Sequence, residues 1–361
     1  MYMKYKVSII IPVYEVAAYI EDCLSSVITQ DYEGIIECVL VDDCGKDRSI
    51  EIAEKIIEKN SEKVDFKILH HDINKGLSAA RNTGFEGSSG DYVFFLDSDD
   101  RLYPNAISSL VEAQQRTGAV VTMGNWNIIE HETGEIISTP GGVYKNEVAF
   151  DDLHVLLSIP SIHGVTQNKL ISRNFWIKND LYQTPGLLYE DNLWSFKLLT
   201  RITKGNKFCV TPSITYVYNS RDGSIMHSIN LKHIQSYIKS VDIAFQIAKT
   251  APDANKWYAM KGLETFKRTA LMNIIQKVEG NDIYDFVYTC IRNHNVVSVY
   301  EYLKCREISI FNKFYYIHNL LPISIGSKLQ FFLIKLQMMK NRSVYRHEKL
   351  KINISTVDLF D

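Results

Sequence analysis

Apolar and polar positions in the first part of the chain follow a pattern that predicts strands separated by helices. The predicted strands are short β-branched or aromatic runs bounded by polar or glycine-containing turns, over residues 7–13, 37–41, 66–71 and 92–96. Between them, Tyr19–Gln30 has apolar residues at helical spacing, and Asp47 is a candidate N-cap for a second helix. This alternation predicts an α/β fold with a mainly parallel sheet flanked by helices, which binds ligands at the carboxyl ends of its strands.

The pattern becomes mixed after Gly118. The next predicted elements are, in chain order, a strand over 119–129, a hairpin-like turn around 131–134, an extended segment over 135–138 and helices near 164–178 and 189–203. We expect this elaboration to cover one side of the sheet.

From about residue 230 onward only helical periodicity is left. The predicted helices there span 232–250, 256–278 and 284–292, with more beyond Ile308. We therefore predict one domain over 1–225 and a helical C-terminal region over 226–361.

Composition and charge narrow the possible classes of protein. A chain of 361 residues with 46% hydrophobic and 23% charged residues is long enough for two domains with a substantial core. The net charge of −2 argues against nucleic acid as a partner, because that affinity depends on many Lys and Arg side chains facing phosphates.

Cysteine spacing and hydropathy bear on location. The six cysteines have no C-x-x-C metal spacing and no disulfide framework, which favours a reducing cytoplasm. The apolar run over 7–13 imitates a signal peptide, but Glu15 and Asp22 follow so closely that a buried strand is the better interpretation. Lys328 and Lys335 interrupt the most apolar C-terminal region, and no run reaches the ~18 apolar residues of a membrane span.

Two acids, Asp42 and Asp43, follow the second predicted strand and precede Cys44 and Gly45. At the ligand-binding edge of the sheet, such carboxylates can accept hydrogen bonds from a base or a ribose. Turns that enter helices also use Asp and Gly to satisfy backbone amides. Both interpretations stay open for this turn.

Three acids, Asp97, Asp99 and Asp100, directly follow the apolar strand over 92–96. Their charges repel one another, and a hard divalent cation bound by one or two carboxylates plus phosphate oxygens would relieve that repulsion. Capping of the helix that Pro104 begins explains one of these acids and not three. The sequence therefore favours metal and ligand binding.

Two predicted helices begin with polar residues that suit a ligand. A turn at Gly76 opens a helix that carries Arg81 and Asn82, and helix amides together with an arginine favour anionic oxygens. Glu190 and Asp191 begin a later helix, where they are either dipole-stabilised acids or a general base. The residues alone leave that choice open.

Taken together, these segments resemble the family 2 glycosyltransferases of the bacterial polysaccharide-biosynthesis type. The segments that carry the resemblance are IIIPVY at 9–14, VDDCGKDRS at 41–49, NKGLSAARNTG at 74–84, DYVFFLDSDD at 91–100 and YED at 189–191. Their order and spacing are similar to those of that family's GT-A catalytic domain, a Rossmann-related fold. The resemblance covers about residues 5–225 and leaves the C-terminal third uncovered. It implies that 1–225 is the catalytic domain, with the nucleotide-sugar-binding part up to about residue 120 and the acceptor side over about 120–225.

The resemblance implies a role for each matching residue. The implied nucleotide-binding residues are Pro12, Tyr14, Asp42 or Asp43, Arg81, Asn82, Asp97, Arg221 and Ser224. Asp99 would ligate Mn²⁺ or Mg²⁺, and Asp97 would touch the ribose or the coordination shell of the metal. Asp191 would be the catalytic base. Arg221 and Ser224 would belong to a segment that closes over the diphosphate.

The implied activity is a metal-dependent, inverting transfer of a hexose from a nucleotide sugar, in the first place a UDP-sugar, to a glycan or lipid-linked saccharide. Cys44 and Gly45 depart from the Gly-Ser common in the family, a mild change in a turn. The Q-x-x-R-W element of processive synthases is missing, which favours addition of a single sugar.

Two other classes of protein share parts of this pattern. A sugar-phosphate nucleotidyltransferase needs a glycine-rich phosphate loop near its N-terminus, and IIIPVYEVAAY contains no glycine. A non-catalytic nucleotide-binding or glycan-binding module would have lost a metal ligand or the base, whereas Asp97, Asp99 and Asp191 are all present. An enzyme is therefore the preferred hypothesis.

The C-terminal segment 311–346 mixes large apolar residues with Lys and Arg and contains no acid. A basic amphipathic helix can lie in an anionic membrane surface. Apolar helical stripes also pack on a neighbouring domain or across a homodimer. The sequence leaves peripheral membrane contact and homodimer formation as alternatives.

Overall fold

The computed structural model describes residues 4–130, 133–139, 145–151, 165–188, 190–220, 231–278, 282–295, 298–304, 313 and 316–340. The chain forms two compact units. The first consists of Met1–Gly186 with Glu190–Ser224, and the second of Leu187–Tyr189 with Ile225–Asp361.

The first unit is built on one mixed sheet, to which ten strands of the described residues contribute. Its strands are β1 (Lys6–Val13), β2 (Ile35–Asp42), β3 (Asp65–His70), β4 (Tyr92–Phe95), β5 (Arg101–Leu102), β6 (Val121–Glu130), β7 (Ile136–Ser138), β8 (Val148–Phe150), β9 (Lys169–Ser172) and β10 (Phe208–Ser220). They run in the order β3-β2-β1-β4-β9-β6-β10-β5, while β7 pairs with β6 and β8 with β10.

The parallel pairing expected from the alternation of strands and helices is confirmed for β3, β2, β1 and β4. Strand β9 continues the sheet antiparallel to both β4 and β6, and β10 lies parallel to β6. The α/β fold with a central sheet flanked by helices is thus confirmed, with a parallel first half and a mixed second half.

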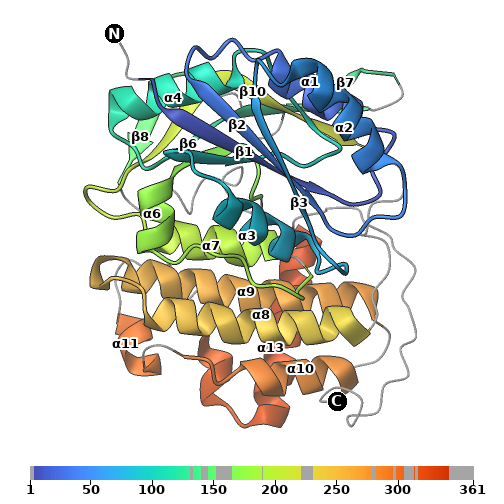
Figure 1. The fold of residues 1–361 in the computed structure, drawn as a ribbon. Coiled ribbons are helices and arrows are strands. Elements are labelled where there is room, and N and C mark those ends of the chain that lie inside the picture. Colours follow the sequence, from blue (N-terminus) through green and yellow to red (C-terminus); the bar gives the residue numbers. More distant parts are fainter. Residues whose placement is uncertain are drawn as a thin grey trace. The chain divides into compact units, whose positions relative to one another are not determined.

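Helices cover both faces of this sheet (Figure 1). They are α1 (Ile20–Ile28), α2 (Ser49–Asn60), α3 (Leu77–Gly87), α4 (Ala106–Thr117), α6 (Arg173–Lys178) and α7 (Glu190–Thr200). Because side chains alternate along β2, Cys38 and Leu40 join the core under α1, α2 and α4, whereas Val39 and Val41 pack against Ala80 of α3. Gly84 lets α3 lie close to the sheet, since a Cβ there would be 2.3 Å from Ile10 Cγ2.

Three strands between residues 120 and 225, namely β8, β9 and β10, were not predicted. The expected helix near 164–178 is wrong in its first part, where β9 precedes α6. The first three residues of β9 are buried between β4 and β6, and a short apolar run without period-2 alternation does not distinguish strand from helix. Strand β10 has register shifts between Val210 and Tyr216, which break its alternation.

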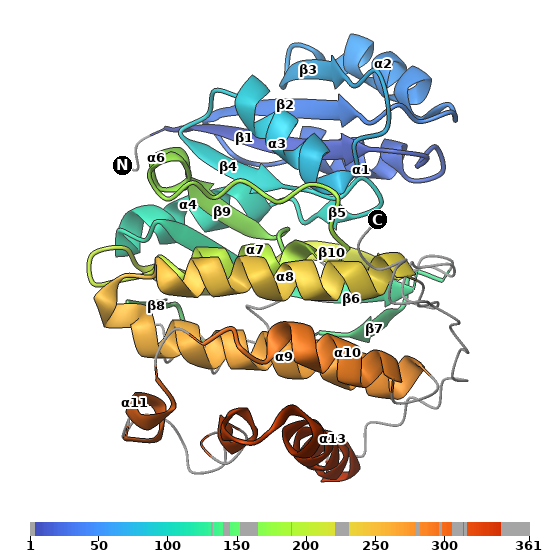
Figure 2. The same ribbon diagram turned by 90° about the horizontal axis from the view of Figure 1, so that it is seen from below.

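The second unit is helical in its described residues, as the sequence predicts. Its elements are α8 (Leu231–Lys249), the 3₁₀ turn η3 (Asp253–Asn255), α9 (Lys256–Lys277), α10 (Asp282–Ile291), α11 (Val299–Lys304), the 3₁₀ turn η4 (Ile317–Leu320) and α13 (Ile323–Lys340). Helices α8 and α9 pack along each other, and α10 contacts α8, α9 and α13 (Figure 2). No helix in the described part of the chain has the length and apolar character needed to cross a bilayer.

Candidate active site

The centre of the candidate site is the buried guanidinium of Arg81 on α3. Its Nη2 lies 2.7 Å from Asp97 Oδ1, directly after β4, and its Nη1 lies 2.8 Å from Asp191 Oδ1 in the first turn of α7. Glu190 Oε1 is 3.9 Å from the same Nη1. One arginine therefore joins acids from two motifs that are far apart in the sequence.

Charge in this cluster is tightly balanced. Burial acts to lower the pKa of Arg81, but the charges of Asp191 and Asp97 raise it above its ordinary value, so the guanidinium stays charged. Burial raises the pKa of Asp97, Arg81 counteracts this effect, and the charges of Asp191 and Asp99 add to it. Burial, followed by the charge of Asp191, likewise raises the pKa of Glu190.

Arg81 and Asn82, which are expected to help seat the diphosphate, both contact other groups of the protein. Arg81 is fully buried, and its terminal nitrogens are engaged by carboxylates. The Asn82 side-chain amide donates to the carbonyl of Gln183 and accepts from the Gln183 backbone N–H, both at 2.9 Å. These contacts hold Asp97, Asp191 and Gln183 in place around α3, and the contact of Arg81 and Asn82 with a diphosphate stays a prediction.

Asp100, the last acid of the motif after β4, has a structural role. It is buried, and it accepts hydrogen bonds from the Tyr216 hydroxyl at 2.6 Å and from the Asn219 backbone N–H at 2.9 Å. Burial, together with the charges of Asp97 and Asp99, raises its pKa well above the usual range. Tyr216 and Asn219 lie on β10, and no sequence motif pointed to them.

Asp97 and Asp99 are the carboxylates that would hold a divalent cation. No group of three or more His, Cys, Asp or Glu in the described residues could hold a metal by itself. Mg²⁺ and similar ions are commonly bound by one or two carboxylates, with substrate phosphates and water completing the shell. The half-buried Asp99 and the repulsion that Asp97 feels from it fit such a site.

The acidic turn after β2 separates into two roles. Asp43 is buried; its Oδ1 accepts from Lys75 N at 2.8 Å and lies 2.6 Å from His71 Nδ1, and its Oδ2 accepts from Gly76 N at 2.8 Å. It therefore fastens the turn before α3, where Gly76 adopts a positive φ of 84°. The Asp42 side chain is 17% exposed, which leaves it the more accessible of the two.

The remaining predicted nucleotide-binding residues lie in and after β1 or outside the described residues. Pro12 is buried in β1, beside Val41 of β2, and Tyr14 directly after the strand is 46% exposed. Arg221 and Ser224 lie outside the described residues, so their roles stay predictions.

Asp191 has neighbours that the sequence did not indicate. The Thr166 hydroxyl donates to Asp191 Oδ1 at 2.5 Å, and Gln183 Nε2 donates to Thr166 Oγ1 at 3.1 Å. The fully buried Lys169 donates to the carbonyl of Val165 at 2.6 Å, and burial lowers its pKa to about 7, a shift that the charge of Asp191 partly offsets. Thr166 and Lys169 precede Asp191 by more than 20 residues, so no local pattern links them.

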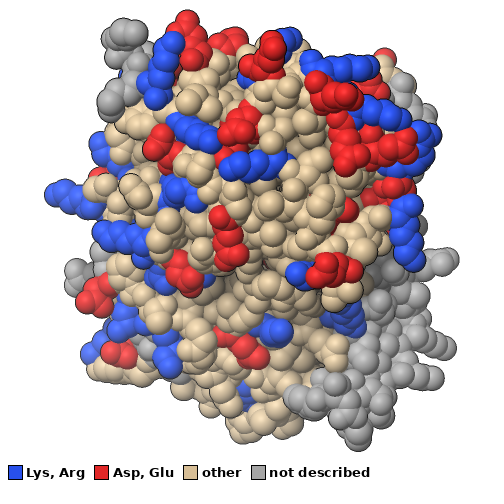
Figure 3. Space-filling model, viewed as in Figure 1, with Lys and Arg blue, Asp and Glu red and all other residues tan. Residues whose placement is uncertain are grey.

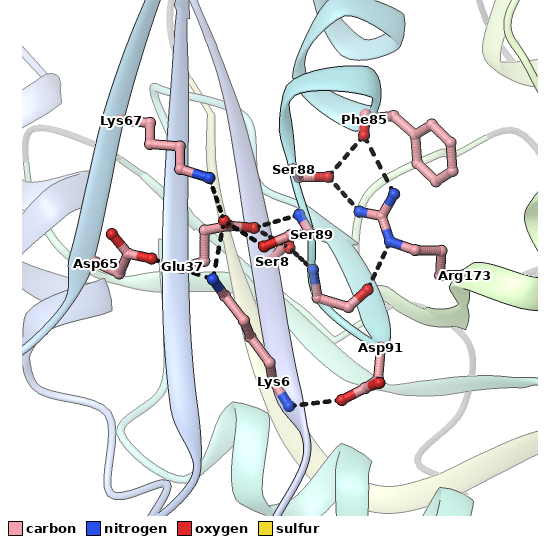
Figure 4. Close-up of polar contacts among 11 residues, drawn as sticks. Lys6, Ser8, Glu37, Asp65, Lys67, Phe85, Ser88, Ser89, Asp91 and Arg173 are labelled. Atoms are coloured by element: carbon pink, nitrogen blue, oxygen red, sulfur yellow. Dashed lines mark hydrogen bonds and ion pairs between the residues drawn. The ribbon is translucent and has the colours of Figure 1, made fainter.

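A second polar network holds the turn between α3 and β4 (Figure 4). Glu37, buried in β2, accepts hydrogen bonds from the backbone and hydroxyl of Ser89, from Ser8 and from Lys67, and it forms an ion pair with Lys6. From the other side Arg173 donates to the Gly90 carbonyl and to Ser88. This clamp fixes the connection between the helix of Arg81 and the strand that leads to Asp97.

Residues 8–176 match the sequence model of a family described as glycosyl transferase family 2. The chain carries a family 2 glycosyltransferase domain. Among its relatives, glycosyltransferase GlyA of Streptococcus pneumoniae serotype 4 is 36% identical over 168 residues, which are 46% of this chain. The chain spans only 23% of GlyA and 50% of a Haemophilus influenzae protein described as an uncharacterized glycosyltransferase.

Solved structures agree with a GT-A fold for this family 2 glycosyltransferase domain. Residues 1–349 of Staphylococcus aureus TarS, solved with UDP-GlcNAc, align with a TM-score of 0.70 at 20% identity, covering 95% of this chain and 93% of that one. The Pyrobaculum calidifontis mannosyltransferase PcManGT, solved with GDP-Man and Mn²⁺, aligns with a TM-score of 0.51 at 13% identity over 94% and 89% of the two chains. At these identities the likeness concerns the fold alone.

Proposed function

We propose that the chain transfers a hexose from a nucleotide-diphosphate sugar to a hydroxyl of a saccharide acceptor, with inversion of the anomeric configuration. The observation that carries the proposal is the pairing of Arg81 with both Asp97 and Asp191. Asp97 lies at the carboxyl edge of the parallel strands, where α/β folds bind ligands. The shared arginine brings it close to Asp191, an acid suited to proton transfer.

Donor recognition is proposed at the carboxyl ends of β1 and β2. Asp42 is the candidate acceptor of a hydrogen bond from the base, because its side chain is more exposed than that of Asp43. Its present contacts are His70 Nδ1 at 3.0 Å from Oδ2 and Gly45 N at 3.3 Å from Oδ1. The exposed ring of Tyr14 offers a surface for stacking. A UDP-sugar is the proposed donor; TarS was solved with UDP-GlcNAc and PcManGT with GDP-Man, which supports a nucleotide sugar.

A divalent cation, Mn²⁺ or Mg²⁺, is the proposed cofactor, with Asp99 and Asp97 as its protein ligands. When bound, such an ion neutralises charge that develops on a departing diphosphate. The protein's contribution is to hold the two carboxylates in place. Arg81 orients Asp97, and the bonds from β10 to Asp100 fix the turn in which Asp99 lies.

Asp191 is the proposed general base. Thr166 and Arg81 both donate to its Oδ1, so Oδ2 is the oxygen proposed to accept the proton of the attacking hydroxyl. Its side chain is 24% exposed, enough for an acceptor to reach it. A single base on the acceptor side implies in-line displacement and therefore inversion, and a positioned base contributes ~10²–10⁴-fold to the rate.

The acceptor is proposed to be a glycan or a lipid-linked saccharide of polysaccharide biosynthesis. Addition of one sugar at a time is proposed because the Q-x-x-R-W element is missing. A cytoplasmic location stays a prediction from the cysteine pattern.

The test combines donor binding with turnover in the full chain. Donor hydrolysis and transfer are measured with UDP-, GDP- and dTDP-sugars in the presence of Mn²⁺, and donor binding is followed by thermal stabilisation. Asp191→Asn should bind the donor as the wild type does and lose transfer by ~10²-fold or more, because an amide cannot accept the proton.

Asp180→Asn makes the same chemical change at an exposed carboxylate of the same unit, and it should leave both measurements unchanged. Donor affinity that collapses together with the rate in Asp191→Asn would show a ligand contact instead of a base. Turnover only with pyrophosphate or a nucleoside triphosphate would identify a nucleotidyltransferase, and binding without turnover of any donor would identify a binding module.

A further inference from the structure

Helix α13 in the second unit has one face that is packed within that unit. Its inward residues recur at helical spacing and are buried: Gly326, Ser327, Gln330, Leu333 and Ile334. A Cβ on Gly326 would lie 2.5 Å from the His318 carbonyl oxygen and 2.6 Å from the Tyr288 hydroxyl, so this face sits closely against η4 and α10. Core packing therefore accounts for the inward face.

The opposite face of α13 carries large apolar side chains in solvent. Ile325 is 55% exposed, Phe332 57% and Leu336 42%, and the exposed Lys328 and Lys335 lie between them. Residues three, four and seven positions apart share one side of a helix, so these five residues form a single row, the outer stripe. Ile323, which begins the helix, is 48% exposed, and Leu320, at the end of η4 just before it, is 58% exposed.

The charges that α13 itself carries have one sign, and the neighbouring acid Asp285 of α10 bonds to Ser327 on the inward face of the helix. Residues 316–340 contain Lys328, Lys335 and Lys340 and no acid. By contrast, Lys and Arg are interspersed with Asp and Glu on the face of the molecule drawn in Figure 3. A surface that binds the outer stripe must therefore accept apolar side chains and present negative charge beside them, where the lysines lie.

We propose that the outer stripe docks on the surface of an anionic phospholipid bilayer, with Ile325, Phe332 and Leu336 in the acyl boundary and the two lysines at the headgroups. An interfacial helix of this kind lies in the plane of the membrane. The 18 residues of α13 give it a length of about 27 Å in that plane, at 1.5 Å per residue.

A second copy of the chain fits the outer stripe less well. In a two-fold symmetric contact the same surface faces itself, so Lys328 and Lys335 of one copy would meet the lysines of the other. No acid on the helix is available to compensate them. An anionic lipid surface supplies that charge, and each Lys near it is worth ~1 kcal/mol, or about fivefold in binding.

This docking surface stands independently of the proposed function. A consequence that does rest on that function concerns the acceptor: an enzyme held at a bilayer would meet acceptors that are linked to lipid. The outer stripe thus favours the lipid-linked saccharide over the free glycan.

The experiment is sedimentation of the full chain with vesicles of phosphatidylcholine alone and with vesicles of an equal mixture of phosphatidylcholine and phosphatidylglycerol. The wild type should bind the mixed vesicles only, and its binding should weaken as salt is raised. Lys328→Gln with Lys335→Gln should weaken binding by about 25-fold, fivefold for each charge removed. Phe332→Ser should weaken it by about tenfold, since its ring no longer enters the acyl boundary.

Matched controls lie elsewhere in the same unit. Lys232→Gln with Lys249→Gln removes two exposed lysines from α8, and Tyr300→Ser removes an aromatic ring that is 65% exposed on α11. Both should bind vesicles like the wild type. Thermal unfolding of every variant verifies the fold, and donor hydrolysis without vesicles should be unchanged, which separates failure of docking from failure of the proposed function.

The proposal is overturned if the wild type ignores the mixed vesicles at low salt, or if the lysine and Phe332 variants bind them as well as the controls do. Self-association that Phe332→Ser abolishes, without vesicle binding, would instead assign the outer stripe to a second copy of the chain.

Discussion

Replacing Glu37 by Gln tests whether the clamp behind the site stabilises the first unit. The carboxylate is fully buried, and each of its oxygens accepts more than one hydrogen bond. An amide keeps the shape and, with its oxygen at the position of Oε2, can retain the bonds from the Ser8 hydroxyl and the Ser89 backbone N–H, but not the bond that the Ser89 hydroxyl donates to Oε1. Its NH₂ group then faces Lys67 and Lys6, which are 2.6 and 3.1 Å from Oε1 in the wild type.

The size of the effect depends on what the two lysines do afterwards. Breaking a fully buried ion pair costs ~3–5 kcal/mol when the remaining charge stays buried. Here the side chains of Lys6 and Lys67 are 26% and 38% exposed, so both ammonium groups can turn toward water. We therefore expect Glu37→Gln to lower the free energy of unfolding by about 2 kcal/mol, roughly 1 kcal/mol for each charge-assisted bond lost.

The pH dependence of this loss has a definite sign. Burial acts to raise the pKa of Glu37, but the contacts from Lys67, Ser8 and Ser89 outweigh it and hold the pKa well below the ordinary 4.5. A depressed folded-state pKa means that the contribution is fully present above about 4.5, the unfolded-state value, and is lost as the pH falls below it. The difference between wild type and variant should therefore be largest near neutral pH and shrink in acid.

Urea unfolding followed by tryptophan fluorescence, at neutral pH and in steps below it, measures this difference. Glu51→Gln is the matched control, because Glu51 also contacts two basic residues, Arg48 and Lys55, yet lies exposed on α2. It should produce no measurable change. A Glu37 variant as stable as the control, or a difference that grows in acid, would refute the clamp.

Three further predictions concern the site. Asp99→Ala should abolish metal-dependent turnover while thermal unfolding shows an intact fold, and undiminished transfer at saturating metal contradicts its role as ligand. Thr166→Val should lower kcat about tenfold with an unchanged KM for the donor, because it removes the hydroxyl that orients Asp191. Thr166→Ser keeps that hydroxyl and should retain the wild-type kcat. A serine variant as slow as the valine variant refutes this role. Because the pKa of Lys169 is lowered to about 7, the unfolded chain binds one more proton than the folded chain between pH 7 and 10.5. The unfolding free energy should therefore rise with pH in that window relative to Lys169→Met, and parallel pH curves for the two proteins would contradict the lowered pKa.

Local pattern was sufficient to predict the first four strands. The runs over 7–13, 37–41, 66–71 and 92–96 were located within about two residues of β1 to β4, because buried parallel strands read as continuous apolar segments. The N-cap of α2 was misplaced by one residue, since Asp47 bonds to Ser49 from just outside the helix. The strands after residue 120 were harder to predict, because β9 is four residues long and β10 is interrupted by register shifts.

The sequence by itself determined the fold class, the family and which motif acids stand at the strand and helix ends, because these follow from short-range periodicity and order along the chain. The tertiary structure alone decided how those acids are used. Arg81 meets Asp191 across 110 positions, and Tyr216 meets Asp100 across 116. Such contacts are set by strand order and register. They bury the guanidinium of Arg81 among carboxylates, a surrounding that the position of Arg81 on a helix did not indicate.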